Sequence, residues 1–426
     1  MQQFVQLALA NDTANITSLQ NQQTTLGAQT TALQQITTDL NNLQSAAFAL
    51  SDPLGALGAL TTSSSNTSVV SATAASTAEA GTHTVTVNSP ATTSSYYTNP
   101  VATSSTPLAS GTFQIQVGSK TPVSVTIDSS DNTLNGLAAA INDLGAGVQA
   151  NVINDANGAR LSLVSSTTGA PGDLTVSGNT TGLTFNKAVT GSNASLTVDG
   201  VPLSSTSNVI SGAIDGVTLN LGSASVGSPV SITIAPDTTQ AANAVNSFVS
   251  SYNAALKDIN AQFAVASDGS GGGPLESDGS LREAQAALLA AVSFSAPGNG
   301  GAVNLASIGV NLNDDGSLSV DASALSSSLA SNFSGVQSFL QNSTTGFANN
   351  LSNAITNLTD PSTGALSLDA QGISQSSSAL GDQISDLQAA LAVKQQNLTQ
   401  VYAQVNETLQ ELPLLQSQLS QQLATI

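Results

Sequence analysis

The residue types that carry most enzyme chemistry are scarce in this sequence. Its 426 residues include one histidine, His83, and no cysteine, so a Ser–His–Asp triad would have to centre on His83. His83 lies in the alternating run Thr82–Val87, in phase with Val85 and Val87, which indicates an edge or partly buried residue of a strand. Because so few of the roles of a catalytic site are filled, a strand position is the better interpretation of His83.

Three further motifs could bind a ligand, and none of them is convincing. The segment Asn311–Gly316 matches the front of a calcium loop, but Ala322 stands where the bidentate glutamate belongs, which favours a β-turn. Paired carboxylates for glycoside cleavage stay open, although the absence of tryptophan and the presence of only four tyrosines leave little aromatic surface for a sugar. The run Gly269–Gly273 has no following Gly-Lys-Ser/Thr, so it indicates a linker rather than a phosphate loop. The sequence predicts no enzyme, no cofactor and no metal site.

Composition argues against several classes of partner. Six basic and 26 acidic side chains give a net charge of −20, which argues against nucleic acid, because its affinity depends on Lys and Arg at phosphates. The same charge argues against a polybasic membrane contact. The apolar run around Phe4–Ala10 is too short to span a membrane and lacks the basic region of a signal peptide. The absence of cysteine excludes disulfides and thiolate sites. Because few residues are charged, the surface is expected to be Ser/Thr/Asn/Gln-rich, like that of an extracellular fibre.

Both ends of the chain carry apolar residues that repeat every seven positions, over the first fifty residues and over about 372–426. Such a seam lets a long helix bury one edge against another helix. The flanking positions hold almost no charges that would fix a partner, so we expect these coiled-coil legs to stay loose until other protein covers them. The seam residues predicted to contact partners are Leu19, Leu26, Leu33, Ile36, Leu40, Leu43, Ile384, Leu387, Leu391, Leu398, Val401, Val405, Leu412, Leu415 and Leu419.

The residues between the legs read as strands followed by helices. Strands are predicted at 82–87, 113–117, 123–127, 148–153, 160–164, 196–198, 217–221 and 230–234, and helices at 131–144, after 237, after a Ser280/Glu283 capping box, over 325–339 and over 347–358. The predicted fold class is α+β: long N- and C-terminal coiled-coil leg helices, a helical body domain and a β-rich head of two small domains. The predicted boundaries are 1–50 and 372–426 for the leg, 51–75 and 237–371 for the body, 76–107 and 196–236 for the inner head domain, and 108–195 for the inserted outer head domain.

Several segments, taken in order, carry a resemblance to a known family. They are Gly81–Val87, Ile214–Leu221, Pro229–Ile234 with Asp237, Phe248-Val249 with Tyr252-Asn253, Ser277–Arg282, Leu305–Val310 and Asp315–Leu318 with Asp321. The segment from Thr133 to Asn142, together with Gly158–Leu161, resembles the insertion motif of flagellins and caps. In this order and spacing, over nearly the whole chain, the motifs resemble the family of the bacterial flagellar filament cap, hook-associated protein 2 (FliD). Its members usually open with a Gly/Ser-rich segment, whereas Met1 is followed here by Gln2–Val5.

The resemblance implies a non-enzymatic, oligomeric assembly factor at the tip of the flagellar filament. It would promote the folding and polymerisation of exported flagellin and so be needed for filament elongation and motility. The implied partners are flagellin, other copies of the chain in a homo-oligomeric ring, hook–filament junction proteins and an export chaperone, with no nucleic acid and no membrane insertion. The implied location is extracellular, at the filament tip, after export through the flagellar type III apparatus.

Two other functions stay open. A surface adhesin could bind host mucin or glycans through the β-rich head, and a null strain would then fail to attach without leaking flagellin. A flagellin or a filament-junction protein would be indicated by purified monomer that grows unaided into long filaments. For the cap, deletion of residues 1–45 or 385–426 is expected to leave the head folded and to abolish filament growth.

Overall fold

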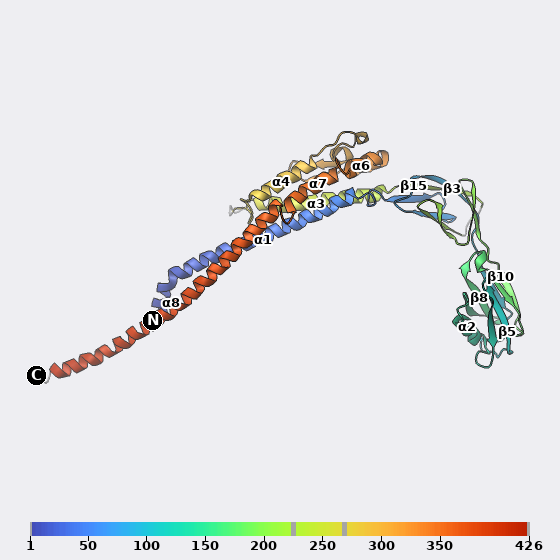
Figure 1. Ribbon diagram of the computed structural model, residues 1–426, viewed down its shortest axis with the longest axis horizontal. Helices are drawn as coiled ribbons and strands as arrows, with labels where there is room; N and C mark the ends of the chain where they lie inside the picture. Colours follow the sequence, from blue (N-terminus) through green and yellow to red (C-terminus); the bar gives the residue numbers. More distant parts are fainter. Residues whose placement is uncertain (1, 223–226, 266–270, 424–426) are drawn as a thin grey trace. The chain divides into compact units, whose positions relative to one another are not determined.

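The computed structural model describes residues 2–222, 227–265 and 271–423 (Figure 1). The chain forms two compact units, which we call the helical unit (Met1–Leu57 with Thr238–Ile426) and the strand unit (Gly58–Asp237). Long helices α1 (Gln2–Ser51) and α8 (Ala365–Leu423) stand at the two ends of the chain. The predicted α+β class, with terminal helices and a β-rich part between them, is confirmed.

Five shorter helices pack with the second half of α1 and the first turns of α8 around one core. They are α3 (Thr238–Phe263), α4 (Gly279–Val292), α5 (Ala322–Ser331), α6 (Phe333–Gln341) and α7 (Phe347–Thr359). Apolar residues spaced three and four apart give α3 one buried face. At its centre Phe248 lies 5.3 Å from Phe347 between ring centroids. The buried Tyr252 hydroxyl donates to the Gly316 carbonyl at 3.0 Å, and burial raises the pKa of Tyr252 to about 12.

Helix ends differ from the sequence prediction at three places. The single helix expected over 325–339 is divided into α5 and α6, because Asn332 leaves helical geometry between them. Helix α4 is capped by Asp278, whose side chain accepts the Leu281 N–H at 2.9 Å, and not by a Ser280 capping box. Helix α8 begins at Ala365 rather than near residue 372, after a turn in which Asp360 accepts two backbone N–H groups.

The calcium-like motif is the turn of a two-stranded hairpin, β16 (Val310–Leu312) and β17 (Leu318–Val320). The N–H of Gly316 donates to the Asn313 carbonyl at 2.9 Å, and the Asp315 carboxylate accepts the Ser317 N–H at 2.9 Å. The predicted β-turn is therefore confirmed. Within the described ranges, no group of His, Asp or Glu is placed to hold a metal ion. The predicted linker at 269–273 lies partly outside the described residues.

The described residues of the strand unit form four sheets and two cores. The first core lies between a five-stranded sheet, in the order β1-β15-β3-β11-β12, and a three-stranded sheet, β13-β14-β2. The second is enclosed by the sheets β10-β4-β8-β7 and β6-β5-β9 and by helix α2 (Leu134–Asp143). The strands are β1 (Leu60–Ser64), β2 (Val70–Ala74), β3 (Gly81–Ser89), β4 (Thr93–Thr98), β5 (Gly111–Val117), β6 (Val123–Ile127), β7 (Val148–Asp155), β8 (Gly158–Thr168), β9 (Leu174–Ser177), β10 (Phe185–Val189), β11 (Ala194–Val198), β12 (Val201–Ser205), β13 (Val209–Ile214), β14 (Val217–Leu221) and β15 (Pro229–Pro236).

Two predicted boundaries need correction. Residues 58–75 were assigned to the helical body, but β1 pairs with β15 and β2 pairs with β14, so they belong to the strand unit. Residues 93–98 were assigned to the inner head domain, but β4 pairs with β8 and β10 in the outer sheet. Both segments are rich in Ser and Thr and carry few apolar residues, so their alternation is weak. The division of the head into an inner domain and an inserted outer domain stays a proposal.

A pair of carboxyl groups joins α8 to α4 in the helical unit. The Ser280 hydroxyl lies 2.6 Å from an Asp278 oxygen and 3.3 Å from an Asp369 oxygen. Burial, followed by the neighbouring Asp278, raises the pKa of Asp369 from 3.8 to about 6. The folded chain therefore holds this proton more tightly than the unfolded chain does, and the stability that it adds is lost as the pH rises from about 4 to about 6.

We therefore expect the helical unit to resist urea better at pH 4.5 than at pH 7. Substitution Asp369→Asn should flatten this pH dependence, because an amide cannot ionise, whereas Asp382→Asn at an exposed position on the same helix should leave it unchanged. Urea unfolding at the two pH values, followed by circular dichroism at the helix band, measures the difference. An unchanged slope in Asp369→Asn would show that other carboxyl groups cause the pH dependence.

Candidate functional site

Helices α1 and α8 run antiparallel along each other (Figure 1). The rings of Phe4 and Tyr402 lie 6.3 Å apart between centroids, and the Lys394 ammonium contacts the Asp12 carboxylate at 2.7 Å. Nearer the body, the Gln23 side chain donates to the Ser377 carbonyl at 3.5 Å. As the residue number rises along α1 it falls along α8, so the two ends of the chain form a paired leg.

The inner part of the predicted seam is covered within the chain itself. Leu33, Ile36, Leu40 and Leu43 are at most 1% exposed and belong to the core that α3 and α7 share. Partner contact by these four residues stays a prediction, but in this chain body helices from distant parts of the sequence already cover them. Deletion of residues 1–45 would consequently remove part of the body's core as well as one of the two helices of the leg.

The middle of the seam is partly covered by the antiparallel partner helix. Ile384 is 7% exposed, and the residues half-buried between α1 and α8 are Leu19, Leu26, Leu387, Leu391 and Leu398. The most buried residues near the start of α1 were not predicted: Val5, Leu9 and Ile16. A straight α-helix drifts about 20° per heptad from a seven-residue repeat. Val5 keeps the seven-residue spacing of Leu19, whereas Leu9 and Ile16 fall beside that position, so the buried edge of α1 is broader than the predicted seam.

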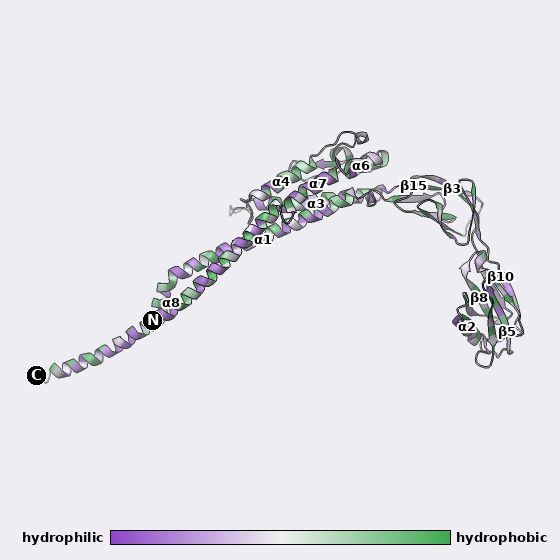
Figure 2. Ribbon diagram, viewed as in Figure 1, coloured by the Kyte–Doolittle hydropathy of each residue, from purple (hydrophilic) through white to green (hydrophobic). Residues whose placement is uncertain are grey.

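In the part of the chain that the structure describes, the outer end of α8 has no such cover. Phe4 meets Tyr402 near the start of α1, and every residue from Ala403 to Gln421 is exposed. We call residues 405–423, about 28 Å of helix, the uncovered end. Apolar and polar residues are interleaved along it (Figure 2). The predicted seam residues in this outer part are between 48% and 58% exposed: Val401, Val405, Leu412, Leu415 and Leu419.

Most of the large apolar side chains of the uncovered end share one face, whereas the exposed Leu414 lies on the opposite side. At 100° per residue, Val405, Leu412 and Leu419 fall within a stripe about 120° wide, which also includes Leu409, Leu415 and Leu423. Glu407 and Glu411 fall outside this stripe. The helix continues through Pro413. Within the described residues this amphipathic face stays exposed to solvent.

A groove with uncharged walls lies where α1 and α8 pair, nearer the body than the uncovered end. It has a volume of about 740 Å³ and is bordered by small side chains of α1, such as Ala10, Thr13 and Ala14, and by Leu391 and Gln395 of α8. Small side chains allow the backbone of another helix to approach closely. The outer leg therefore offers both a groove and an exposed apolar stripe.

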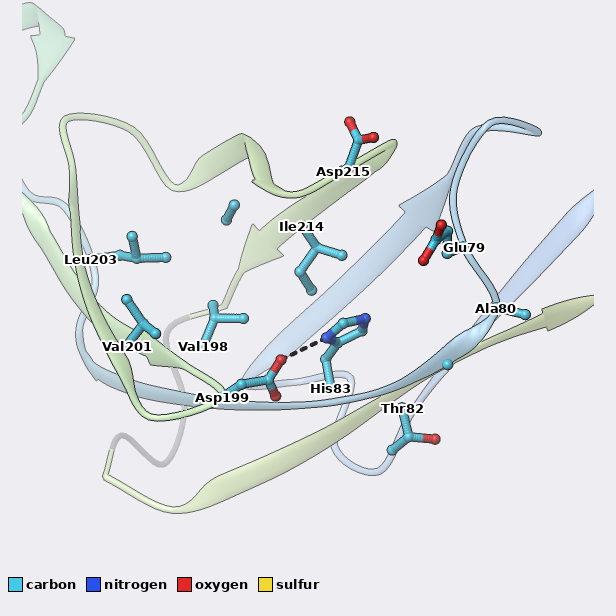
Figure 3. A pocket seen from close by; sticks show the side chains of 12 residues that line it. Glu79, Ala80, Thr82, His83, Val198, Asp199, Val201, Leu203, Ile214 and Asp215 are labelled. Carbon is cyan, nitrogen blue, oxygen red and sulfur yellow. Dashed lines mark hydrogen bonds and ion pairs between the residues drawn. The ribbon is translucent and has the colours of Figure 1, made fainter.

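The only histidine of the chain lies in a pocket of the strand unit, between the five-stranded and the three-stranded sheets (Figure 3). The Nδ1 atom of His83 on β3 lies 2.7 Å from an oxygen of Asp199, which stands in the β11–β12 turn. Asp199 has a positive φ of 50°, and its other oxygen accepts the Thr84 N–H at 2.8 Å. The hydrogen bond to His83, followed by that to Thr84, lowers the pKa of Asp199, so this carboxylate stays charged.

This pair does not complete a triad. The described residues that line the pocket include no serine and no cysteine. Thr82, which adjoins His83 on β3, contacts the Thr233 hydroxyl at 3.2 Å instead. His83 is a half-buried strand residue, as predicted, and its side chain lies at the rim of a pocket. The sequence analysis did not find Asp199 as the partner of His83, because the two residues lie far apart along the chain and Asp199-Gly200 indicated only a turn.

No described helix is long and apolar enough to cross a membrane.

Comparison with known proteins points to one family. Residues 191–413 match the family model described as flagellar hook-associated protein 2 C-terminus, and residues 1–94 match the corresponding N-terminus model. The B-type flagellar hook-associated protein 2 of Pseudomonas aeruginosa is 31% identical, over 99% of this chain and 94% of that protein. The flagellar hook-associated protein 2 of Escherichia coli K12 is 29% identical, over 76% of this chain and 74% of that protein. The crystal structure of the D1-D2-D3 domains of the flagellar cap protein FliD from Escherichia coli has a TM-score of 0.57 at 29% identity, and the match covers 80% of this chain and 99% of that one.

Proposed function

This chain belongs to the flagellar hook-associated protein 2 family, and we propose that it caps the growing filament and promotes the folding and polymerisation of exported flagellin. The family is one of structural flagellar cap proteins that oligomerise, and membership supports a cap role for this chain. The step from a cap to an assembly factor for flagellin is the part that we propose.

The observation that carries the proposal is the uncovered end of α8. Its leucines are about half exposed, and full burial of such a side chain contributes about 1.5–3 kcal/mol. This free energy is gained only when other protein covers the stripe. An assembly factor needs a surface of this kind, because its binding must be driven by contacts that are absent in the isolated chain.

The two parts of the leg then have different roles. The inner seam, with Leu33 and Leu40, anchors α1 in the body, while the stripe around Leu412 and the groove around Ala14 bind flagellin or sister subunits. Few charges stand along these surfaces, so apolar contact rather than ion pairing drives the binding. This division places the partner contacts on Val401, Val405, Leu412, Leu415 and Leu419, and not on the inner residues of the seam.

The proposal extends to the setting in which the chain works. It includes a homo-oligomeric ring at the filament tip, an extracellular location, export through the flagellar type III apparatus, and contacts with hook–filament junction proteins and an export chaperone. The family membership and the low content of basic and sulfur-containing side chains support this setting.

The experiment is truncation after Gln404 in a strain that lacks the native gene. All removed residues that the structure describes are exposed or lie at the end of α8, so thermal unfolding should match that of the full chain. We expect cells with the truncated chain to leak unpolymerised flagellin and to be non-motile, while the full-length chain restores both filament growth and motility.

Restored motility in the truncated strain would contradict the proposal. A null strain that builds normal filaments but fails to attach to mucin would favour the adhesin instead. Flagellin in the culture medium, measured by immunoblot beside filament length from electron microscopy, distinguishes these outcomes.

A further inference from the structure

The histidine pocket has apolar walls and an acidic rim. It holds about 510 Å³, a size typical of binding pockets. Val198 and Leu203 form the wall on the side of the five-stranded sheet, and Ile214 faces them from the three-stranded sheet (Figure 3). Val201 at the mouth is 59% exposed. A guest with an aliphatic part would cover this apolar surface.

Three carboxylates stand around these walls: Glu79, Asp199 and Asp215. Asp199 is held in place by His83 and Thr84. Among the described residues, Glu79 and Asp215 have no hydrogen bond or ion pair from their side chains, and no lysine or arginine lines the pocket. The rim therefore complements a positively charged group that its own chain does not supply there.

The strand unit has one basic side chain that can fill this role from another molecule. Of its three bases, Arg160 pairs with Asp155 at 3.5 Å and Lys187 pairs with Asp173 at 2.8 Å. Lys120 is exposed in the turn between β5 and β6, and the structure gives its ammonium no ion pair in the described chain. Its Nζ lies near Gly147, in the connection between α2 and β7, so it does not enter its own pocket.

We propose that the histidine pocket binds a lysine side chain, and that Lys120 of a second copy of this chain supplies it. The aliphatic stem lies against Val198, Val201 and Ile214, while the ammonium is placed between the carboxylates of Glu79 and Asp215. The family's oligomerisation brings copies together, so this inference deepens the proposed assembly and rests on it. Lysine suits the site better than arginine, because the carboxylates stand at separate points of the rim and present no single fork for a planar guanidinium.

Disulfide trapping tests the contact in the full chain, which contains no native cysteine. One preparation carries Lys120→Cys and the other Asp215→Cys, and the two are mixed under mild oxidation. We expect a mixed disulfide dimer to form at least tenfold faster than in a control in which Lys257→Cys, an exposed lysine of the helical unit, replaces the Lys120 variant. Equal rates for the two mixtures would overturn the proposal.

The single histidine supplies a second, independent readout. In chain labelled with ¹³C-histidine, the His83 ring gives one resonance, which should shift as the chain concentration rises and copies associate. Lys120→Gln should abolish the shift, and so should Glu79→Gln combined with Asp215→Asn. A shift that survives in Lys120→Gln would overturn the assignment of the second copy.

A short peptide tests whether the segment around Lys120 is enough to occupy the pocket. The acetylated and amidated pentapeptide of residues 118–122 should shift the His83 resonance, and the same peptide with glutamine in place of lysine should not. Equal shifts from both peptides would show that charge plays no part and would overturn the site. Neither readout depends on motility, so loss of the trapped disulfide with normal filament growth would contradict this contact while leaving the proposed cap function intact.

Discussion

A chain with Leu412→Glu and Leu419→Glu is expected to fold as the parent does and to support no filament growth. Both leucines lie on the apolar stripe of the uncovered end and are more than half exposed, so a charge at either position meets water in the isolated chain. In the assembled state the same charges would be buried against a partner without a counter-ion, which costs several kcal/mol for each charge. Thermal unfolding by circular dichroism and filament length in a complemented null strain measure the two expectations.

The matched control is Gln410→Glu with Ser417→Glu. It adds two charges with the same spacing to the same helix, but on the side opposite the stripe. We expect this control to restore filaments. If both pairs abolished growth, added charge rather than loss of the stripe would be the cause, and the proposed contact surface would be wrong.

Substitution Leu40→Ala is expected to destabilise the helical unit by about 3–5 kcal/mol, the range for removal of a buried leucine side chain from a core that does not collapse. Leu40 is fully buried among residues of α1, α3 and α7. The identical substitution at Leu412, which occupies the same heptad position on the other leg helix, should change stability by no more than about 0.5 kcal/mol. Urea unfolding monitored at the helix band gives both values.

A loss at Leu412 as large as that at Leu40 would show that the uncovered end is packed in the isolated chain. The proposed assembly surface would then have no free face. A small loss at Leu40 would instead mean that the inner seam is loose, as the sequence alone suggested.

The strongest repeats of the sequence were sufficient to predict the longest elements. The heptads predicted α1 and α8, and clean alternation predicted β5, β6 and β14, the last two with the bounds that the structure has. Strands β1 and β2 were missed, because their Ser/Thr-rich sequences alternate weakly and are ordered by pairing with β15 and β14. The break at Asn332 was missed because the apolar spacing continues across it.

For the candidate site, the sequence predicted which edge of each helix is apolar, but not which part of that edge is covered. Heptad spacing identifies which edge of a helix is apolar, but Leu40 and Leu412 look alike in sequence. What separates them is whether α3 and α7 pack beside them, and those helices lie far away along the chain. In the same way His83 was placed on a strand, whereas its partner Asp199 is brought to it by the pairing of β3 with β11.

The β1–β15 ladder has a consequence for how such chains can diversify. It pairs Leu60 with Pro236, and the Asp237 N–H donates to the Ala59 carbonyl at 2.9 Å. The first and last residues of the strand unit are therefore hydrogen-bonded to each other. The whole unit is thus one continuous insertion whose two ends leave the helical unit side by side. Its outward-facing loops can therefore be lengthened, shortened or exchanged without a change in the sequence of the terminal helices.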